Sequence, residues 1–362
     1  MRTTQRVRRA GLATVAALVI GGSGVAVGAA ATGSSASGTT ATVTPGPVVP
    51  GSYAGPASYA GVVRQVLPSV VLIRTADGLG SGVVLDRSGN IITNAHVAGS
   101  ATKFQVQVAG DTAPRTARLV GTYPPDDLAV IRADDPSGLQ PARFGDSGQA
   151  QAGDVVLAIG NPLGLSGSVT QGIVSATDRA VTEPATQGSA AATLPGAIQT
   201  SAPINPGNSG GALVSTSGQV IGIPTLAAAS PQGGAQAQGI GFAIPSNLAR
   251  DIATQIIDSG HVTNSHRAAL GAEVATVLGA DGAPGSRVGV GVVSVTSAGA
   301  AERAGLRPGD VIKSAGQSPT PDTTALSQVL AAARPGDKLT VAISRGGQDR
   351  TVQVTLGELP GS

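Results

Sequence analysis

The sequence of 362 residues contains no cysteine and no tryptophan, and it has only three histidines. Without cysteine the chain can form no disulfide bond, no thiolate zinc site and no cysteine nucleophile. Three histidines at their separations, without any cysteine, do not make a zinc cluster of the usual ligand spacing, so we expect no metal site and no cofactor. Aromatic residues make up 2% of the chain. Its cores must therefore be built from Val, Ile, Leu and Ala, which favours β-sheets.

Charged residues are also scarce, at 12% against 41% hydrophobic residues, and the formal net charge is +2. The clear basic cluster is N-terminal and consists of Arg2, Arg6, Arg8 and Arg9, so no nucleic-acid partner is predicted. Glycine and proline are abundant, at 53 and 24 residues, and follow no fixed period. This composition indicates many turns and argues against a collagen or coiled-coil fold.

The first 31 residues resemble an export signal. Four arginines in residues 1–9 precede an apolar run at 10–20, and three alanines follow at 29–31. This is the layout of a cleaved secretory signal peptide. Alternatively, residues 10–31 form an uncleaved membrane anchor, because about 20 apolar residues suffice to cross a bilayer. Both readings place the remainder outside the cytoplasm, either secreted or anchored at the cell membrane.

Residues 32–58 consist mainly of Gly, Ser, Thr, Ala and Pro, which predicts a low-complexity linker. Tyr53 and Tyr59 are unusual near such a segment because the chain has so few aromatics. They occur there by chance or mark an ordered contact.

Short β-like runs separated by Gly, Asn and Asp begin soon after Val62 and predict an all-β barrel or sandwich. We expect strands at 70–74, 82–85, 90–93, 104–108, 128–132, 155–159, 172–175, 212–214 and 220–223. A helix is predicted at 246–259, with Ser246 as its N-cap and Ile252, Ile256 and Ile257 on one face.

A polar linker at 260–267 leads into a second unit that mixes strands and helices. Strands are predicted at 288–295, 311–312, 338–344 and 349–356, and helices at 300–304 and 323–333. This unit is therefore a separate α+β domain.

The segment 207–211 (GNSGG) precedes an apolar strand and suggests a serine nucleophile at Ser209. A nucleophilic serine needs a tight turn and backbone N–H groups aimed at the developing oxyanion, and glycines permit that backbone. In a chain this rich in glycine, a Gly-rich hairpin turn is the alternative, so the motif is weak alone.

A serine nucleophile needs a general base, normally a histidine. His96 ends the apolar run 91–93 and enters a turn, whereas His261 and His266 lie in the polar linker, where we expect them to be solvated. The carboxylate that orients the base is Asp126 or Asp127, because both precede the apolar strand 128–131. Spacing alone does not choose between them.

Seven collinear segments resemble the HtrA (Deg) family of exported serine proteases. They cover residues 80–84 (GSGVV), 89–97 (GNIITNAHV), 127–131 (DLAVI), 158–164 (AIGNPLG), 198–200 (IQT), 204–213 (INPGNSGGAL) and 239–245 (GIGFAIP). The resemblance implies a mainly β chain, with a chymotrypsin-like double β-barrel at 59–260 and a C-terminal α+β PDZ domain at 268–358. It also implies the catalytic triad His96, Asp127 and Ser209.

Further sites follow from the resemblance. The oxyanion hole falls at Gly207, Asn208 and Ser209, where the N–H groups of Gly207 and Ser209 would contribute. Substrate-binding positions fall at Thr200, Ile204, Ile223 and Thr225, with a small or medium apolar P1 residue expected. The carboxylate-binding loop of the PDZ domain falls at Leu270, Gly271 and Ala272. PDZ domains bind peptide C-termini by adding a strand.

Two residues depart from the family pattern. Ser201 stands where the family usually has Asp, and Pro224 stands where it usually has Asn. Pro224 lacks an N–H group, which could alter pairing with substrate. The family commonly trimerises through its N-terminal segment, so Tyr53 and Tyr59 become candidates for such an interface.

The leading hypothesis is an endopeptidase that cleaves unfolded or damaged exported proteins in a stress response. A chaperone-like binder with a vestigial triad is the alternative. A third hypothesis, a peptide-sensing PDZ module that regulates the protease, overlaps with the first.

Overall fold

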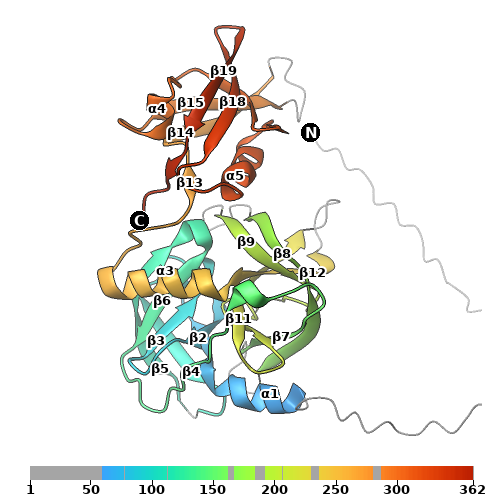
Figure 1. Ribbon diagram of the computed structural model, residues 1–362. Helices are drawn as coiled ribbons and strands as arrows, with labels where there is room; N and C mark the ends of the chain where they lie inside the picture. Colours follow the sequence, from blue (N-terminus) through green and yellow to red (C-terminus); the bar gives the residue numbers. More distant parts are fainter. Residues whose placement is uncertain are drawn as a thin grey trace, which may run out of the picture. The chain divides into compact units, whose positions relative to one another are not determined.

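The computed structural model describes residues 59–76, 78–111, 113–161, 167–183, 192–205, 207–229, 236–279 and 287–361 (Figure 1). The predicted signal or anchor at 1–31, the linker at 32–58 and Tyr53 lie outside these ranges. Within them, no helix has the length and apolar character needed to cross a membrane.

The first half of the N-terminal domain is a closed six-stranded barrel. It follows helix α1 (Tyr59–Val66) and the 3-10 turn η1 (Leu67–Ser69), and its order is β1-β2-β3-β6-β5-β4. The strands are β1 (Val70–Arg74), β2 (Leu79–Val84), β3 (Asn90–Thr93), β4 (Lys103–Val108), β5 (Arg115–Tyr123) and β6 (Leu128–Ala133). Strand β4 alternates between less and more buried residues, as expected for a strand with one face on a core.

The second half is another closed barrel, in the order β10-β11-β12-β9-β8-β7. Its strands are β7 (Val155–Gly160), β8 (Ser168–Glu183), β9 (Ala192–Thr200), β10 (Ala212–Ser215), β11 (Val220–Ala229) and β12 (Gln236–Pro245). One apolar cluster takes Val70 and Ile92 from the first barrel and Leu157 and Ile223 from the second. The barrels therefore share a core, and the predicted double β-barrel is confirmed.

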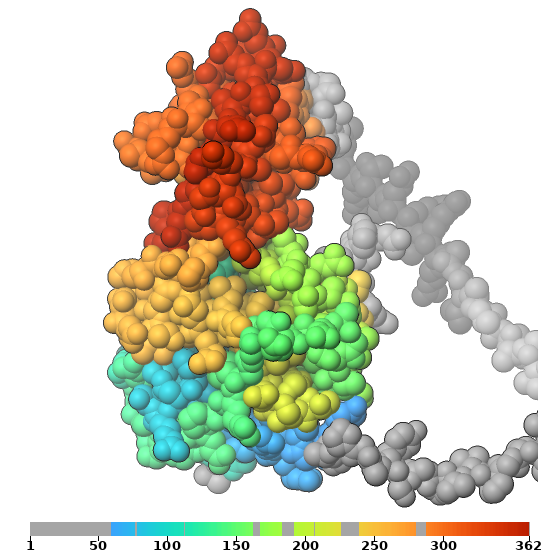
Figure 2. Space-filling view, viewed as in Figure 1, coloured from blue at the N-terminus to red at the C-terminus, as the bar shows by residue number. Residues whose placement is uncertain are grey.

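Helix α3 (Ser246–Ser259) packs against strands of both barrels, including β5, β6 and β11, and lies at the surface in Figure 2. Ile252 and Ile256 are buried, as predicted. Ser246 is not the N-cap, and that prediction is wrong. Pro245 occupies the cap position, and Ser246 Oγ instead donates to the carbonyl of Gly145 at 2.8 Å.

The C-terminal part is an α+β domain, as predicted. Its main sheet runs β14-β15-β16-β18-β19, with β17 paired to β16 and a separate pair β13-β20. The strands are β13 (Ala268–Ala269), β14 (Ala272–Leu278), β15 (Arg287–Val295), β16 (Val311–Ala315), β17 (Ser318–Pro319), β18 (Lys338–Arg345), β19 (Gln348–Thr355) and β20 (Gly357–Glu358). Helices α4 (Ala300–Arg303) and α5 (Thr323–Ala331) complete it. Strand β14 lies at one edge of the sheet, so part of its backbone can pair with another strand.

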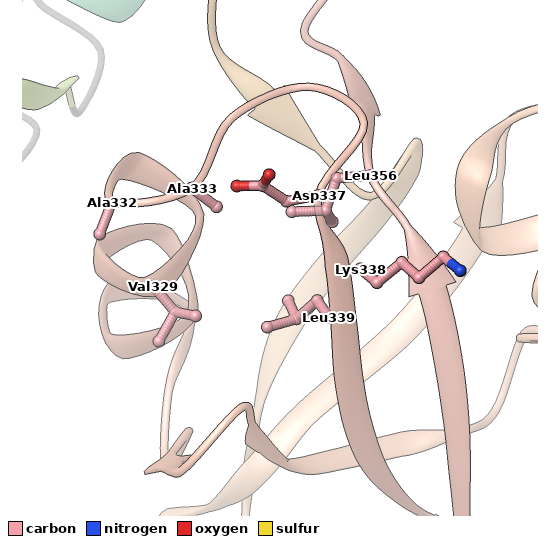
Figure 3. A pocket seen from close by; sticks show the side chains of 7 residues that line it. All are labelled: Val329, Ala332, Ala333, Asp337, Lys338, Leu339 and Leu356. Carbon is pink, nitrogen blue, oxygen red and sulfur yellow. The ribbon is translucent and has the colours of Figure 1, made fainter.

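A pocket of about 320 Å³ lies between α5 and the start of β18 (Figure 3). In the close-up, Val329 and Leu339 point toward each other, and Lys338 extends away from the helix. The lining is Val329, Ala332, Ala333, Asp337, Lys338, Leu339 and Leu356. It includes no residue of the predicted carboxylate-binding loop of the PDZ domain, so we assign it no function.

Candidate active site

His96 and Asp127 meet at one end of the first barrel. His96 lies in the short helix α2 (Ala95–Ala98) after β3, and Asp127 lies at the entry to β6. The Nδ1 atom of His96 is 2.8 Å from Asp127 Oδ2, and the backbone N–H of His96 donates to Asp127 Oδ1 at 2.9 Å. The carboxylate therefore fixes both the ring and the backbone of the histidine.

The backbone around Asp127 directs its side chain to His96. Asp127 has a left-handed conformation, with φ of 51°, at the end of the 3-10 turn η2 (Pro124–Asp126). Its carbonyl accepts hydrogen bonds from the N–H of Ala95 at 3.0 Å and from Asn94 Nδ2 at 3.1 Å. Such a conformation is uncommon outside glycine and persists when neighbouring contacts hold it. The side chain of Asp127 is 2% exposed and that of His96 is 31% exposed, so the base is open to a substrate while the acid is shielded.

Asp126, the other candidate, points elsewhere. Its buried carboxylate accepts a hydrogen bond from Arg267 Nη1 at 3.0 Å. Burial raises the pKa of this carboxyl from 3.8 to about 6, although the Arg267 charge opposes the shift. The structure therefore brings Asp127, and not Asp126, to the histidine.

Ser209 comes from the second barrel, in the loop before β10. Two flanking glycines have positive φ, 103° at Gly207 and 78° at Gly210. A Cβ atom at Gly210 would lie 2.2 Å from the carbonyl oxygen of Ser81, which no side chain could tolerate. The glycines of the GNSGG motif are thus required by backbone conformation and close packing, as the sequence indicated.

The two barrels are linked at this point through Thr225 in β11. Its hydroxyl donates to Asp127 Oδ2 at 2.6 Å, and its carbonyl accepts the hydroxyl of Ser209 at 2.9 Å. Thr225 lies at a β-bulge, where the pairing of β11 with β12 shifts between Pro224 and Leu226. The bulge lets one residue face both the carboxylate and the serine.

The predicted oxyanion-hole residues are adjacent to the serine. The N–H of Asn208 donates to the carbonyl of Asn205 at 3.0 Å. That leaves the N–H groups of Gly207 and Ser209 as the two candidates for binding an oxyanion, the pair that the family resemblance implied.

The predicted substrate-binding residues are largely interior. Thr200, Ile204 and Ile223 are buried, and Thr200 Oγ1 donates to the carbonyl of Ile173 at 2.8 Å. The hydroxyl of Thr225 is hydrogen-bonded to Asp127. The contact of these positions with substrate stays a prediction.

The two departures from the family pattern have definite surroundings. Ser201 directly follows β9, and its Oγ accepts the N–H of Ile173 in β8 at 3.0 Å. Pro224 lies in register with Ala243, and its carbonyl accepts the N–H of Gly210 at 2.9 Å. Proline at 224 thus still contacts the serine loop through its carbonyl.

Other predicted residues lie apart from the triad. His261 and His266 are exposed, as expected, and Nε2 of His266 lies 3.3 Å from Oδ2 of Asp251. In the predicted PDZ loop, Gly271 has φ of 68° and Leu270 is buried, with its carbonyl bonded to the N–H of Ala301 at 2.7 Å. Among the described residues, no cluster of three or more metal-binding side chains is present.

Ser81 in β2 lies in the family-like segment 80–84, but the sequence assigned it no role. Its side chain is buried and bonded to the serine loop. A small polar residue between two glycines inside an apolar strand was the available signal.

Two domain families match the chain. A trypsin-like peptidase domain matches residues 80–223, and a PDZ domain matches residues 262–356.

Curated relatives match over most of the chain. It is 39% identical over 324 residues to the serine protease PepD of Mycobacterium tuberculosis, covering 84% of this chain and 67% of PepD. It is 37% identical over 320 residues to the serine endoprotease DegS of Escherichia coli, covering 84% of this chain and 87% of DegS. The periplasmic serine endoprotease DegP of Escherichia coli is 38% identical over 279 residues, covering 77% of this chain and 56% of DegP. The match thus spans little more than half of DegP.

Solved structures agree with these relatives. The HtrA-type protease AlgW, solved with a decapeptide, superposes with a TM-score of 0.55 at 34% identity and covers 84% of this chain and 99% of its own. A serine endoprotease from Yersinia pestis superposes with a TM-score of 0.55 at 35% identity. The match covers 84% of this chain and 99% of that structure.

Proposed function

Because the chain belongs to the HtrA family of serine endopeptidases with a PDZ domain, we propose that it cleaves unfolded or damaged polypeptides outside the cytoplasm. The observation that carries this proposal is the 2.8 Å contact between His96 Nδ1 and Asp127 Oδ2, at the junction where Thr225 also bonds Ser209. This junction between the barrels joins a base, its orienting carboxylate and a nucleophile.

In the proposed reaction Ser209 is the nucleophile and His96 the general base. The hydroxyl of Ser209 donates to the Thr225 carbonyl, and rotation about χ1 is needed to redirect it to His96 Nε2. His96 takes the proton as Ser209 Oγ attacks the peptide carbonyl carbon. Asp127 accepts the Nδ1 hydrogen and stabilises the imidazolium.

The tetrahedral intermediate places its oxyanion at the N–H groups of Gly207 and Ser209, which stabilise the developing charge. His96 then protonates the departing amine, and the C–N bond breaks to leave an acyl-enzyme on Ser209. Water, deprotonated by His96, then attacks the acyl carbon, and the ester bond to Ser209 Oγ breaks. His96 returns the proton to Ser209 Oγ, and the second product leaves with a free carboxylate.

The C-terminal domain is proposed to bind peptide C-termini for delivery or regulation. Strand β14 is an edge of its sheet, and an extended peptide can add there as a further strand. The loop Leu270, Gly271 and Ala272 would receive the terminal carboxylate. The decapeptide solved with the AlgW protease supports peptides as the ligand class.

Export and assembly are further parts of the proposal. The arginines and apolar run of residues 1–31 support export by a signal peptide or an anchor, and the relative DegP is named as periplasmic. Tyr59 is 42% exposed and its hydroxyl accepts a hydrogen bond from Gln171. Its exposure supports a homotrimer contact through the N-terminal segment.

The proposal is tested with the purified chain, Ser209→Ala and unfolded casein. We expect Ser209→Ala to lose about 10⁵-fold or more in the rate of cleavage, as when a triad nucleophile is removed. A serine-directed fluorophosphonate should label Ser209, identified by peptide mass. Equal cleavage by both proteins would overturn the protease assignment. Suppression of casein aggregation by Ser209→Ala without cleavage would add a chaperone-like activity to the proteolytic one.

A further inference from the structure

Ser81 uses all its polar atoms at the junction of the two barrels. Its side-chain oxygen donates to the carbonyl of Gly207 at 2.5 Å and accepts the N–H of Asn161 at 2.8 Å. Its own N–H donates to the carbonyl of Ser209 at 2.9 Å, and its carbonyl accepts Thr93 Oγ1 at 2.6 Å. Ser81 is 0% exposed, so these partners are not exchanged for bulk water.

These bonds fix two peptide planes of the serine loop. In a trans peptide the C=O and the next N–H point in opposite directions. In the Gly207–Asn208 peptide, the carbonyl points to Ser81 and the N–H points to Asn205. In the Ser209–Gly210 peptide, the carbonyl again points to Ser81 and the N–H points to Pro224. The intervening peptide carries the N–H of Ser209. Its direction is set by the two planes that flank it and by the N–H of Gly211, which donates to the carbonyl of Asn208 at 2.9 Å.

The serine loop has two backbone hydrogen bonds of its own, from the N–H of Asn208 to Asn205 and from the N–H of Gly211 to Asn208. Gly207 and Gly210 both adopt positive φ and have no Cβ to restrict them. The loop also approaches the end of β7 closely, since a Cβ on Gly160 would lie 2.5 Å from the Gly207 carbonyl oxygen. Its conformation therefore also depends on anchors outside the loop, and the Ser81 hydroxyl is a buried side-chain anchor that also reaches the N–H of Asn161 at the end of β7.

We propose that Ser81 is a positioning residue for catalysis: its hydroxyl holds the Gly207–Asn208 peptide so that the N–H and Oγ of Ser209 face the substrate carbonyl. It acts through the loop and does not touch the reacting atoms. The inference rests on the proposed roles of Gly207 and Ser209. A buried serine in the first barrel thus sets the oxyanion hole carried by the second.

The test compares Ser81→Ala with Ser246→Ala in the full chain. Ser246 is a matched control, because it is also buried and also donates to a glycine carbonyl, that of Gly145, away from the serine loop. Kinetics use a quenched fluorescent peptide taken from a casein cleavage site. We expect Ser81→Ala to lower kcat by about 10- to 100-fold, the scale of a displaced catalytic group or a weakened oxyanion donor, with KM changed by less than about threefold. Ser246→Ala should keep kcat within about twofold, because it removes no contact to the reacting groups.

Labelling of Ser209 by the fluorophosphonate should slow in Ser81→Ala in parallel with kcat, because the adduct also needs the oxyanion hole. If Ser81→Ala does not fold, Ser81→Cys fills the site with a slightly larger thiol, which is a weak donor, and it should show the same fall in kcat. Unchanged kcat in a folded Ser81 variant, or equal losses in the Ser81 and Ser246 variants, would overturn the proposal. Failure of the proposed function is distinguishable, because then the wild-type chain itself would not cleave.

Discussion

A buried aspartate–arginine pair is present in each part of the molecule, and the two pairs differ in how many hydrogen bonds the carboxylate receives. Asp126 of the protease part accepts one hydrogen bond, from Nη1 of Arg267 in the following linker at 3.0 Å, and its Oδ2 has no partner among the described residues. In the PDZ part, Asp310 accepts Arg345 Nε at 2.6 Å, Arg345 Nη2 at 2.7 Å and the N–H of Arg307 at 2.9 Å.

The pKa values of the two carboxyl groups move in opposite directions. Burial raises the pKa of Asp126 to about 6, and one arginine contact does not offset it. The bidentate hydrogen bonds from Arg345 lower the pKa of Asp310 despite its burial. The comparison teaches that a buried carboxylate is stabilised in its charged form when both oxygens are satisfied, and that an opposite charge nearby is insufficient.

The largest effect is expected for Arg267→Ala. It removes the partner of Asp126, which is 0% exposed, and breaking a buried pair costs about 3 kcal/mol of the free energy of unfolding at pH 7. At pH 5 Asp126 is mostly protonated in the wild type, so the loss should shrink to about 1 kcal/mol or less. Urea unfolding at both pH values measures this.

Arg250→Ala is the control, because Arg250 is an exposed arginine on α3, and it should leave stability unchanged at both pH values. A loss for Arg267→Ala that is equal at pH 5 and pH 7 would mean that the Asp126 charge is not involved.

The second largest effect is the pH dependence of folding stability that Asp126 causes. Its folded pKa of about 6 lies above the unfolded value of 3.8. The protonated group therefore contributes stability that is full below pH 3.8 and is lost as pH rises through 6. The shift corresponds to about 3 kcal/mol. Asp126→Asn should remove this component, so that its melting temperature relative to wild type rises from pH 4 to pH 7. Parallel melting curves across this range would exclude the assigned shift.

Several features were predictable because they depend on local sequence. The glycines of the serine loop, the strand end that carries His96 and the apolar face of α3 each have a local pattern that fixes the backbone. Strands β5, β9, β12 and β14 were missed. In β9 and β12, Pro195, Gly196 and several glycines interrupt the β pattern. Their pairing within the second barrel supplies the stability that the local sequence lacks.

Other features depend on contacts distant in the sequence. Asp126 and Asp127 both directly precede β6, so sequence spacing could not distinguish them. The positive φ of Asp127 is what turns the two side chains in different directions. Ser81 contacts Gly207 and Asn161, which are 126 and 80 residues away, and its role cannot be read from its neighbours. The same applies to Ser246, whose N-cap pattern is overridden by a bond to Gly145.

The smallest effect is expected for Asp310→Asn. Asn accepts fewer charge-assisted hydrogen bonds, but the Arg345 side chain is 24% exposed and can be hydrated. The loss should therefore be about 1 kcal/mol at pH 7. Because the folded pKa of Asp310 lies below 3.8, its contribution is present above pH 3.8 and is lost only as pH falls through the lower folded value. Between pH 4 and 6 the cost of Asp310→Asn should stay constant, while that of Asp126→Asn changes. Calorimetry of both variants at three pH values in this range measures the contrast. If the stability cost of the two variants changed with pH in the same way, the number of hydrogen bonds would not set the direction of the pKa shift.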